Sequence, residues 1–152
     1  MKAYFFLIPL ILLSCNQSYK SPNGYNVIEL YEYNGQPWNA DASNNKLYRD
    51  YRSDGILYFK MAKLNYSLKR SIIANSTIDS IFFRTSYQKY RPRPQCPIGF
   101  NRILLLKSHS TIKYVIKFND YCEECFVINY QTNNINYLKI GYDDFAEILK
   151  SK

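Results

Sequence analysis

The chain has 152 residues and a formal net charge of +8, which reflects 20 Lys and Arg against 12 Asp and Glu. That length corresponds to one ordinary domain with room for a hydrophobic core, and the absence of any internal repeat excludes repeat architectures. The 16 Tyr and 9 Phe against only 5 Gly predict more strand than helix, because aromatic side chains favour pleated, half-buried surfaces.

The net charge falls in one block of the sequence. Residues 80–119 contain no Asp or Glu, whereas the rest of the chain is neutral overall. The block supplies eight cations: Arg84, Lys89, Arg91, Arg93, Arg102, Lys107, Lys113 and Lys117.

The first fifteen residues carry a targeting pattern. Lys2 is followed by an almost unbroken apolar run over residues 4–13, and Leu12-Leu13-Ser14 leads into Cys15. The run is too short for a membrane-spanning helix, which needs about 20 residues. The pattern resembles a bacterial lipoprotein signal with its lipobox. That resemblance implies cleavage before Cys15 and acylation of this cysteine, with two or three chains that keep the protein on its membrane.

The same resemblance sets the expected organisation and location. We expect a signal peptide over residues 1–14, a polar tether over residues 15–24 and a single domain over residues 25–152. Asn16 follows the cysteine in place of the Asp that resembles an inner-membrane retention signal, and no acidic run indicates surface export. The expected location is the outer membrane, facing the periplasm.

The domain is expected to open with a strand and a long loop. Residues 25–33 alternate well enough for a first strand. Residues 36–54 are polar, contain the only Trp and show no clean period, which indicates a long loop with a short helix near residues 47–52.

The next segments give three further expected elements. Residues 56–64 are predicted to form a strand. Residues 66–75 are predicted to form a short helix, because apolar residues recur every four positions from Leu64 to Ile72 and Asn75 suits a C-terminal cap. Residues 77–87 alternate apolar and polar side chains, which predicts a strand.

Two hairpins are expected in the second half of the domain. The three Pro of residues 88–99 preclude regular structure there. One hairpin is predicted to join residues 101–107 to residues 111–118, and another to join residues 126–130 to residues 135–140.

A last helix completes the expected fold, with Asp144 and Glu147 resembling a capping box. These elements predict an α+β domain: a mostly antiparallel sheet of about five to seven strands with two short helices over one face.

The first hairpin has a predicted register. If His109-Ser110 is a two-residue loop, Lys107 faces Ile112. The same register places Arg102 beside Lys117, a like-charge pair that is unfavourable unless solvent or an anion screens it.

Three cysteines remain after acylation of Cys15, and three interpretations of them stay open. In an oxidising compartment, Cys96 is expected to bridge to Cys122 or Cys125. A redox pair of Cys122 and Cys125 is the second interpretation, but two Glu lie inside the CxxC and would suppress the thiolate. The third is a metal site with a carboxylate as fourth ligand, because His109 at a hairpin tip would lie too far away.

Most catalytic chemistry is missing from the sequence. The single His excludes most Cys-His and Ser-His machinery, and there is no Gly-rich phosphate loop, HExxH or calcium-loop pattern. We therefore expect a non-enzymatic protein without catalytic residues, metal or cofactor.

The basic block is the candidate binding region. Aromatic and cationic side chains that alternate can bind phosphates or stack on rings, although such runs are often only solvated faces. The expected partners are an anionic envelope polymer, a lipid headgroup or an acidic protein, in addition to the membrane held through the N-terminal lipid; nucleic acid is not expected. The alternatives are an envelope thiol-disulfide oxidoreductase and an immunity or inhibitor lipoprotein. The candidate binding residues are Arg84, Lys89, Tyr90, Arg91, Arg93, Arg102, Lys113 and Lys117.

Overall fold

The structure is a computed structural model that describes residues 19–36, 54–83, 99–140 and 142–150. In chain order its elements are β1 (Val27–Tyr33), α1 (Asp54–Lys63), β2 (Tyr66–Ile73), α2 (Ser76–Phe82), β3 (Arg102–Ser108), β4 (Thr111–Asn119), β5 (Glu124–Asn129), β6 (Ile135–Lys139) and α3 (Tyr142–Lys150).

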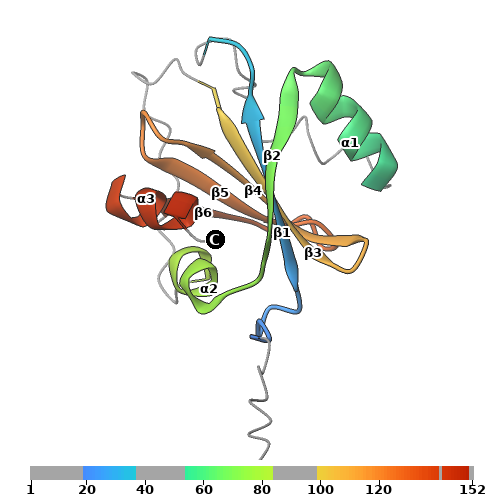
Figure 1. Cartoon of the computed structure of the whole chain (residues 1–152), viewed down its shortest axis with the longest axis vertical. Helices are drawn as coiled ribbons and strands as arrows, with labels where there is room; N and C mark the ends of the chain where they lie inside the picture. Colours follow the sequence, from blue (N-terminus) through green and yellow to red (C-terminus); the bar gives the residue numbers. More distant parts are fainter. Residues whose placement is uncertain (1–18, 37–53, 84–98, 141, 151–152) are drawn as a thin grey trace, which may run out of the picture.

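The described strands form one antiparallel sheet in the order β2-β1-β3-β4-β5-β6 (Figure 1). The predicted α+β class is confirmed, and six strands fall within the predicted five to seven. Both predicted hairpins are present, as β3 with β4 and as β5 with β6. None of the described helices is long and apolar enough to span a membrane.

The central strand β3 is buried on both of its faces. Ile103 and Leu105 belong to one core, Leu104 and Leu106 belong to the other, and none of the four is more than 1% exposed. A continuous apolar run of this kind is typical of a strand that is covered on both sides. The sheet is therefore the middle layer of the domain.

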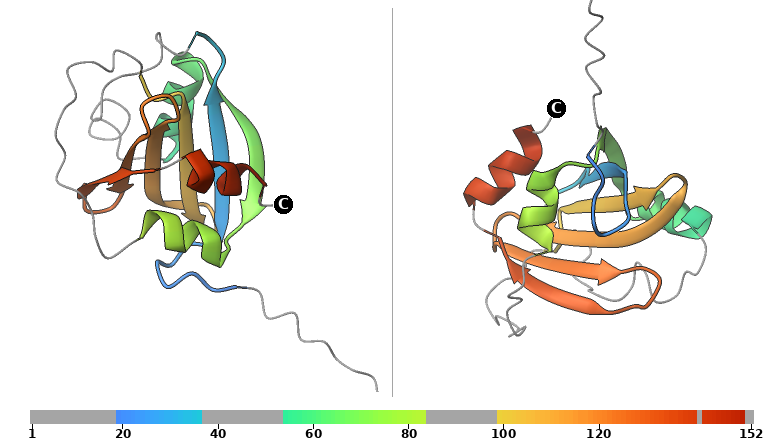
Figure 2. Two further views of the ribbon diagram at one scale, coloured as in Figure 1. Left: turned by 90° about the vertical axis from the view of Figure 1, so that its left-hand side faces the viewer. Right: turned by 90° about the horizontal axis from the view of Figure 1, so that it is seen from below.

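Helices cover both faces of the sheet (Figures 1 and 2). On one face α2 and α3 contribute Ile78, Phe82 and Ile148 to the core around Leu104. On the other face α1 contributes Leu57 and Met61 to the core around Ile103. The sequence predicted two helices over one face; the helix on the second face was not predicted.

Three predicted elements between residues 56 and 87 are wrong. The predicted strand over 56–64 is the helix α1, and the predicted helix over 66–75 is the strand β2. The predicted strand over 77–87 is the helix α2 as far as Phe82, and residues 84–87 lie outside the described part of the chain.

The physical reason is that a spacing of four residues fits both a helix and a strand. In β2 the repeat does not mark one buried face, because the bulge at Lys69 lies between Leu68, which is 51% exposed, and Ile72, which packs against the core around Leu104. In α1 the same spacing separates Leu57 from Met61, which are both buried. Asn75 does not end a helix but begins one, since its side chain accepts a hydrogen bond from the Ile78 backbone N–H at 3.0 Å.

A bulge changes the predicted register of the β3–β4 hairpin. Lys107 faces Ile112 as predicted, but the register shifts between Leu106 and Lys107. Beyond the shift Arg102 pairs with Phe118, and Lys117 pairs with Ile103. The prediction that Arg102 and Lys117 lie side by side is wrong, because the extra residue in β4 moves their side chains to opposite faces of the sheet.

The strand β2 forms an outer edge of the described sheet. Its pairing with β1 skips Lys69, because Leu30 faces Arg70 while Tyr31 faces Leu68. Lys69 and Arg70 are exposed at this bulge. Such devices keep an edge strand from pairing with another chain.

Two predicted irregular segments, 36–54 and 88–99, lie outside the described residues except at their ends. The final helix α3 begins at Tyr142, two residues before the predicted cap at Asp144. Asp143 and Asp144 occupy its first turn, where negative charge stabilises the helix.

Candidate functional site

The predicted basic residues of the described strands do not share one exposed face. Arg102 lies 3.5 Å from Glu32 and 3.4 Å from Asp120, measured between the nearest charged atoms. Lys117 is 0% exposed, and its Nζ lies 4.8 Å from the centre of the Phe100 ring. These two cations are therefore engaged inside the domain rather than presented to a partner.

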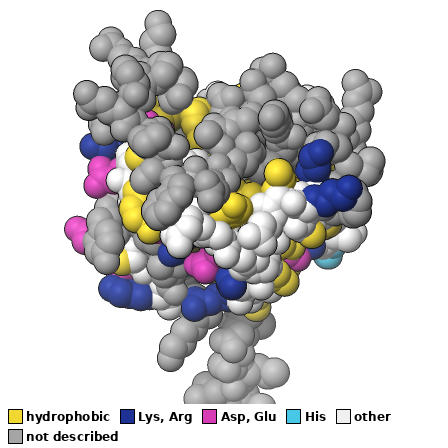
Figure 3. Space-filling model, turned by 90° about the horizontal axis from the view of Figure 1, so that it is seen from above, with side chains coloured by type: hydrophobic (Ala, Val, Ile, Leu, Met, Phe, Trp, Pro, Cys, Tyr) yellow, Lys and Arg dark blue, Asp and Glu magenta, His cyan; other side chains and the backbone are white. Residues whose placement is uncertain are grey.

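The other predicted binding residues are either half-buried or outside the described chain. Lys113 is half-buried in β4. Where the surface is described at the end of the sheet that carries Arg102, cationic and anionic side chains lie interspersed rather than in one cationic patch (Figure 3). The remaining predicted residues, Arg84, Lys89, Tyr90, Arg91 and Arg93, lie outside the described residues.

The two described cysteines have different environments. Cys125 lies on β5 as a free thiol that is 0% exposed, and burial raises its pKa well above the ordinary value. Cys122 is half-buried in the β4–β5 turn, where the Asn119 Oδ1 accepts its backbone N–H at 3.2 Å. The CxxC thus runs from a turn into a strand, whereas low-pKa thiols of such motifs are often placed at a helix N-terminus.

The pairing of the cysteines is partly visible. Of the two described cysteines, Cys122 is disulfide-bonded and Cys125 is free. The predicted candidate Cys96 and the lipidation candidate Cys15 both lie in the parts of the chain that the structure does not describe.

His109 lies at the tip of the β3–β4 hairpin. Its side chain is exposed and its φ is 54°, a left-handed conformation typical of a tight turn. The nine residues of β4 separate it from the β4–β5 turn, a distance of about 30 Å at 3.3 Å per residue. Among the described residues, no three His, Cys, Asp or Glu side chains are grouped so as to hold a metal ion.

The strongest polar cluster that the sequence did not predict is centred on Asp79 of α2. Its carboxylate is 9% exposed, and a buried carboxylate needs hydrogen-bond donors. All four of its donors come from one short segment before β1: Tyr19 Oη, Ser21 Oγ at 3.0 Å, Asn23 Nδ2 at 2.7 Å and Tyr25 Oη at 3.1 Å.

A tight turn brings these donors together. Gly24 has a φ of +74°, and its N–H donates to the Ser21 carbonyl at 3.1 Å. Glycine reaches this left-handed conformation without steric strain. Residues 19–24, which the sequence assigned to the tether, are consequently fixed on α2 by Asp79.

The cluster changes the acidity of its tyrosines. The hydrogen bond to Asp79, helped by burial, raises the pKa of Tyr19 to about 12. Burial and the neighbouring Asp79 charge also raise the pKa of Tyr25. Both hydroxyls therefore stay protonated, and keep donating to the carboxylate, to a higher pH than an ordinary tyrosine.

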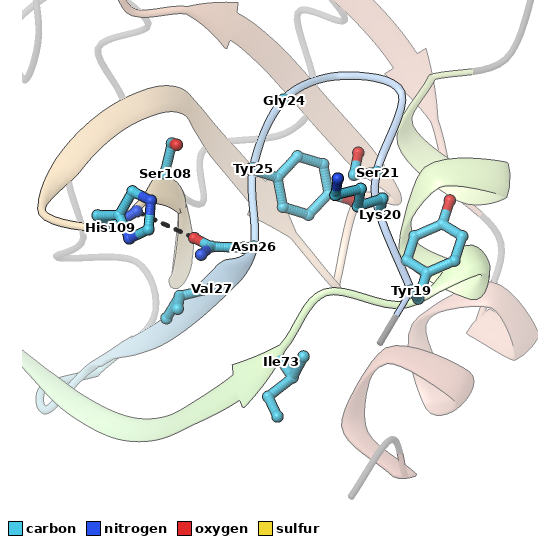
Figure 4. A pocket seen from close by; sticks show the side chains of 10 residues that line it. All are labelled: Tyr19, Lys20, Ser21, Gly24, Tyr25, Asn26, Val27, Ile73, Ser108 and His109. Atoms are coloured by element: carbon cyan, nitrogen blue, oxygen red, sulfur yellow. Dashed lines mark hydrogen bonds between the residues drawn. The ribbon is translucent and has the colours of Figure 1, made fainter. Parts of the chain in front are cut away.

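A cavity of about 580 Å³ lies beside this segment. The N-terminal segment, the start of β1, the end of β2 and the β3–β4 turn form its walls (Figure 4). The backbone N–H of His109 donates to Asn26 Oδ1 at 3.0 Å and joins two of these walls. The described residues that line the cavity are Tyr19, Lys20, Ser21, Gly24, Tyr25, Asn26, Val27, Ile73, Ser108 and His109. None of them is acidic.

A second carboxylate, that of the half-buried Glu29, lies on the α1 face of the sheet. The Lys107 Nζ is 2.7 Å from Glu29 Oε1, and both side chains are 14% exposed. The hydroxyls of Tyr31 and Tyr58 donate to Glu29 Oε2 at 3.1 Å and 2.9 Å. Burial lowers the pKa of Lys107, but the bonds to Glu29 and Tyr58 outweigh it and leave the pKa raised.

Neither carboxylate cluster was predicted from the sequence. Asp79 lies in a segment predicted as a strand, three of its donors lie in the predicted tether, and the fourth, Tyr25, lies at the start of the predicted first strand. The one available signal was the density of hydrogen-bonding side chains in residues 19–25. Comparisons of the chain with protein-family models, curated proteins and solved structures found no match.

Proposed function

We propose that the chain is a lipid-anchored envelope protein that binds an anionic partner and does not act as an enzyme. In this proposal residues 1–14 are removed, Cys15 is acylated, and the domain faces the periplasm from the outer membrane. The main support for this proposal is that side chains of residues 19–25 donate hydrogen bonds to the Asp79 carboxylate, which fixes the chain from Tyr19 onward. Removal of residues 1–14 therefore leaves every contact described above in place.

The buried polar groups support binding over catalysis. Asp79 and Glu29 both have their carboxylate oxygens engaged by side chains of the protein itself. A general acid or base needs an open position for the substrate proton. Asp79 instead fastens residues 19–25 to α2, and Glu29 fastens α1 to the sheet.

The engaged cations narrow the proposed anion-binding region. Arg102, Lys107 and Lys117 are paired or buried. The candidate cations that remain for a partner are the half-buried Lys113 and those of residues 84–93, which alternate with Tyr87 and Tyr90. The proposed partner is an anionic polymer or an acidic protein of the envelope, bound through charge and aromatic stacking.

A thiol oxidoreductase is less well supported. An attacking thiol must be exposed and have a lowered pKa, whereas Cys125 is buried and its pKa is raised. With Cys15 acylated, Cys96 is the one cysteine left to pair with Cys122. We therefore propose a disulfide between Cys96 and Cys122. By the chain-entropy relation, closing this loop stabilises the folded protein by about 3.5 kcal/mol.

A non-reducing peptide map of the membrane-purified protein tests the anchor and the disulfide. We expect an N-terminal peptide that starts at Cys15 and carries acyl mass, together with a bridged peptide containing Cys96 and Cys122. A Cys15→Ala variant is the control and should be released from the membrane fraction. An uncleaved or unacylated N-terminus would overturn the anchor, and a Cys122–Cys125 bridge would overturn the structural role of the disulfide.

Binding is tested with the lipidated protein in neutral nanodiscs and purified lipopolysaccharide as the probe. Arg91→Ser with Arg93→Ser removes two cations of the proposed region, and Lys69→Ser with Arg70→Ser removes two exposed cations elsewhere. At about 0.5–1 kcal/mol per charge, the first pair should weaken binding about five- to thirty-fold and flatten its salt dependence. Equal losses in both variants would contradict the assignment to residues 84–93.

A further inference from the structure

The distance between Cys15 and the domain is short. The chain becomes fixed at Tyr19, because its hydroxyl donates to Asp79. Four residues span at most about 14 Å, whereas the ten residues of the predicted tether could span about 35 Å. This inference rests on the acylation of Cys15 proposed above: an acylated Cys15 keeps the end of the domain at Tyr19 close to the bilayer.

That end of the domain has the chemistry of a membrane-contact surface. Ile73, at the end of β2, is 71% exposed and is the most exposed of the described large apolar side chains. Lys20 and His109 are exposed beside it, and the three side chains line the same cavity (Figure 4). The described lining has no carboxylate that would repel an anionic headgroup.

We propose that the surface formed by Lys20, Val27, Ile73 and His109 lies against an anionic phospholipid bilayer. Ile73 reaches the boundary between headgroups and acyl chains, and Lys20 lies beside lipid phosphates. The cavity of about 580 Å³ faces the headgroups. The opposite end of the sheet, with Arg102 and Tyr121, then points away from the membrane.

Weak contacts are sufficient to orient an anchored domain. The acyl chains already hold the domain at the membrane, so each contact acts on orientation alone. Insertion of one large aliphatic side chain and approach of one Lys to an anionic surface each favour the oriented state about five-fold. Together they favour it about 25-fold.

Lipid-depth quenching tests the orientation. Ile73→Cys and Leu68→Cys are each labelled with an environment-sensitive fluorophore in the full-length lipidated protein, in vesicles that contain phosphatidylglycerol and doxyl lipids. Leu68 is the matched control because it is an aliphatic residue of the same strand, 51% exposed and about 15 Å from Ile73. The unsubstituted protein, labelled in parallel, measures any background from its own cysteines.

We expect the label at position 73 to be quenched at least about two-fold more than the label at position 68, because only the former reaches the headgroup boundary. Replacing phosphatidylglycerol by a neutral lipid should reduce the difference. Equal quenching at both positions in a protein whose Cys15 carries acyl mass would overturn the orientation and leave the anchor standing. Absence of acyl mass would overturn the anchor, and the orientation with it.

Discussion

Two carboxylates, that of the buried Asp79 and that of the half-buried Glu29, hold this domain together in different ways. Asp79 is surrounded by neutral donors, three hydroxyls and one amide, whereas Glu29 is paired with the ammonium group of Lys107 and two tyrosines. The partners of Asp79 all belong to residues 19–25, but those of Glu29 come from β1, β3 and α1. The first cluster fastens one segment, and the second joins two layers of the fold.

This comparison predicts that the charge of the hydrogen-bond partners matters more than the small difference in exposure between the two carboxylates. Loss of Asp79 frees a segment that can return to water, so its donors are solvated again. Loss of Glu29 leaves a cation between α1 and the sheet, where Lys107 is only 14% exposed. Removing one partner of a buried pair is more harmful than removing both.

Glu29→Gln should give the largest effect. We expect the free energy of unfolding to fall by about 2–3 kcal/mol, because the largely enclosed Lys107 ammonium group loses its counter-charge. Adding Lys107→Met should recover part of the loss. Urea unfolding followed by circular dichroism measures both.

The exposed pair of Lys139 and Glu123 is the matched control for that experiment. Its charged atoms are 3.1 Å apart, but both side chains are 41% exposed. Glu123→Gln should cost under about 1 kcal/mol. Similar losses at Glu29 and Glu123 would show that burial does not distinguish the two pairs.

Asp79→Ala should have a smaller and more local effect. We expect a loss of about 1–2 kcal/mol in global stability, since the four donors regain water. The diagnostic result is faster amide hydrogen exchange in residues 19–25 with little change in β3 and β4. Ser80→Ala, at an exposed position of the same helix, is the control and should leave the exchange of residues 19–25 unchanged. Unchanged exchange in Asp79→Ala would show that other contacts fix this segment.

The smallest effect is expected at high pH. The folded-state pKa of Tyr19 is about 12, above the ordinary value of 10.0, so the folded protein holds this proton more tightly than the unfolded chain. The stability that it contributes is complete below about pH 10 and is lost as the pH rises toward 12. Tyr19→Phe should therefore lose less stability than the unsubstituted protein between pH 10 and 12.

Parallel urea titrations at several pH values measure that difference. Tyr121→Phe is the control, because Tyr121 is 63% exposed in the β4–β5 turn. Identical pH profiles for Tyr19→Phe and the unsubstituted protein would contradict the strong hydrogen bond between Tyr19 and Asp79.

Much of the fold was predictable because its hairpins are local. The β3–β4 and β5–β6 pairs join neighbouring apolar runs across short turns, and their existence follows from pattern alone. Residues 56–83 were not predictable in this way, because apolar residues four apart suit either element and tertiary packing decides between them. The single extra residue in β4 likewise has no sequence signal, yet it separates Arg102 from Lys117.

The candidate site was largely unpredictable for a related reason. Asp79 and Tyr19 are 60 positions apart in the sequence, so no local pattern connects them. The basic block over residues 80–119 was evident from the sequence. Whether a cation in it can contact a partner, however, depends on the direction of its side chain. Lys107 and Lys117 point into the domain, and this follows from strand register rather than from composition.

The bulged edge of β2 has a consequence for how copies of the protein meet. In the proposed lipid-anchored state, molecules confined to one membrane plane would collide side by side at high local concentration, and an open sheet edge would let them join into ribbons. The skipped residue Lys69 interrupts the row of backbone donors and acceptors, and the adjacent Arg70 adds a second positive charge. Two such edges repel each other and do not match in register, so lateral crowding leaves the domains separate.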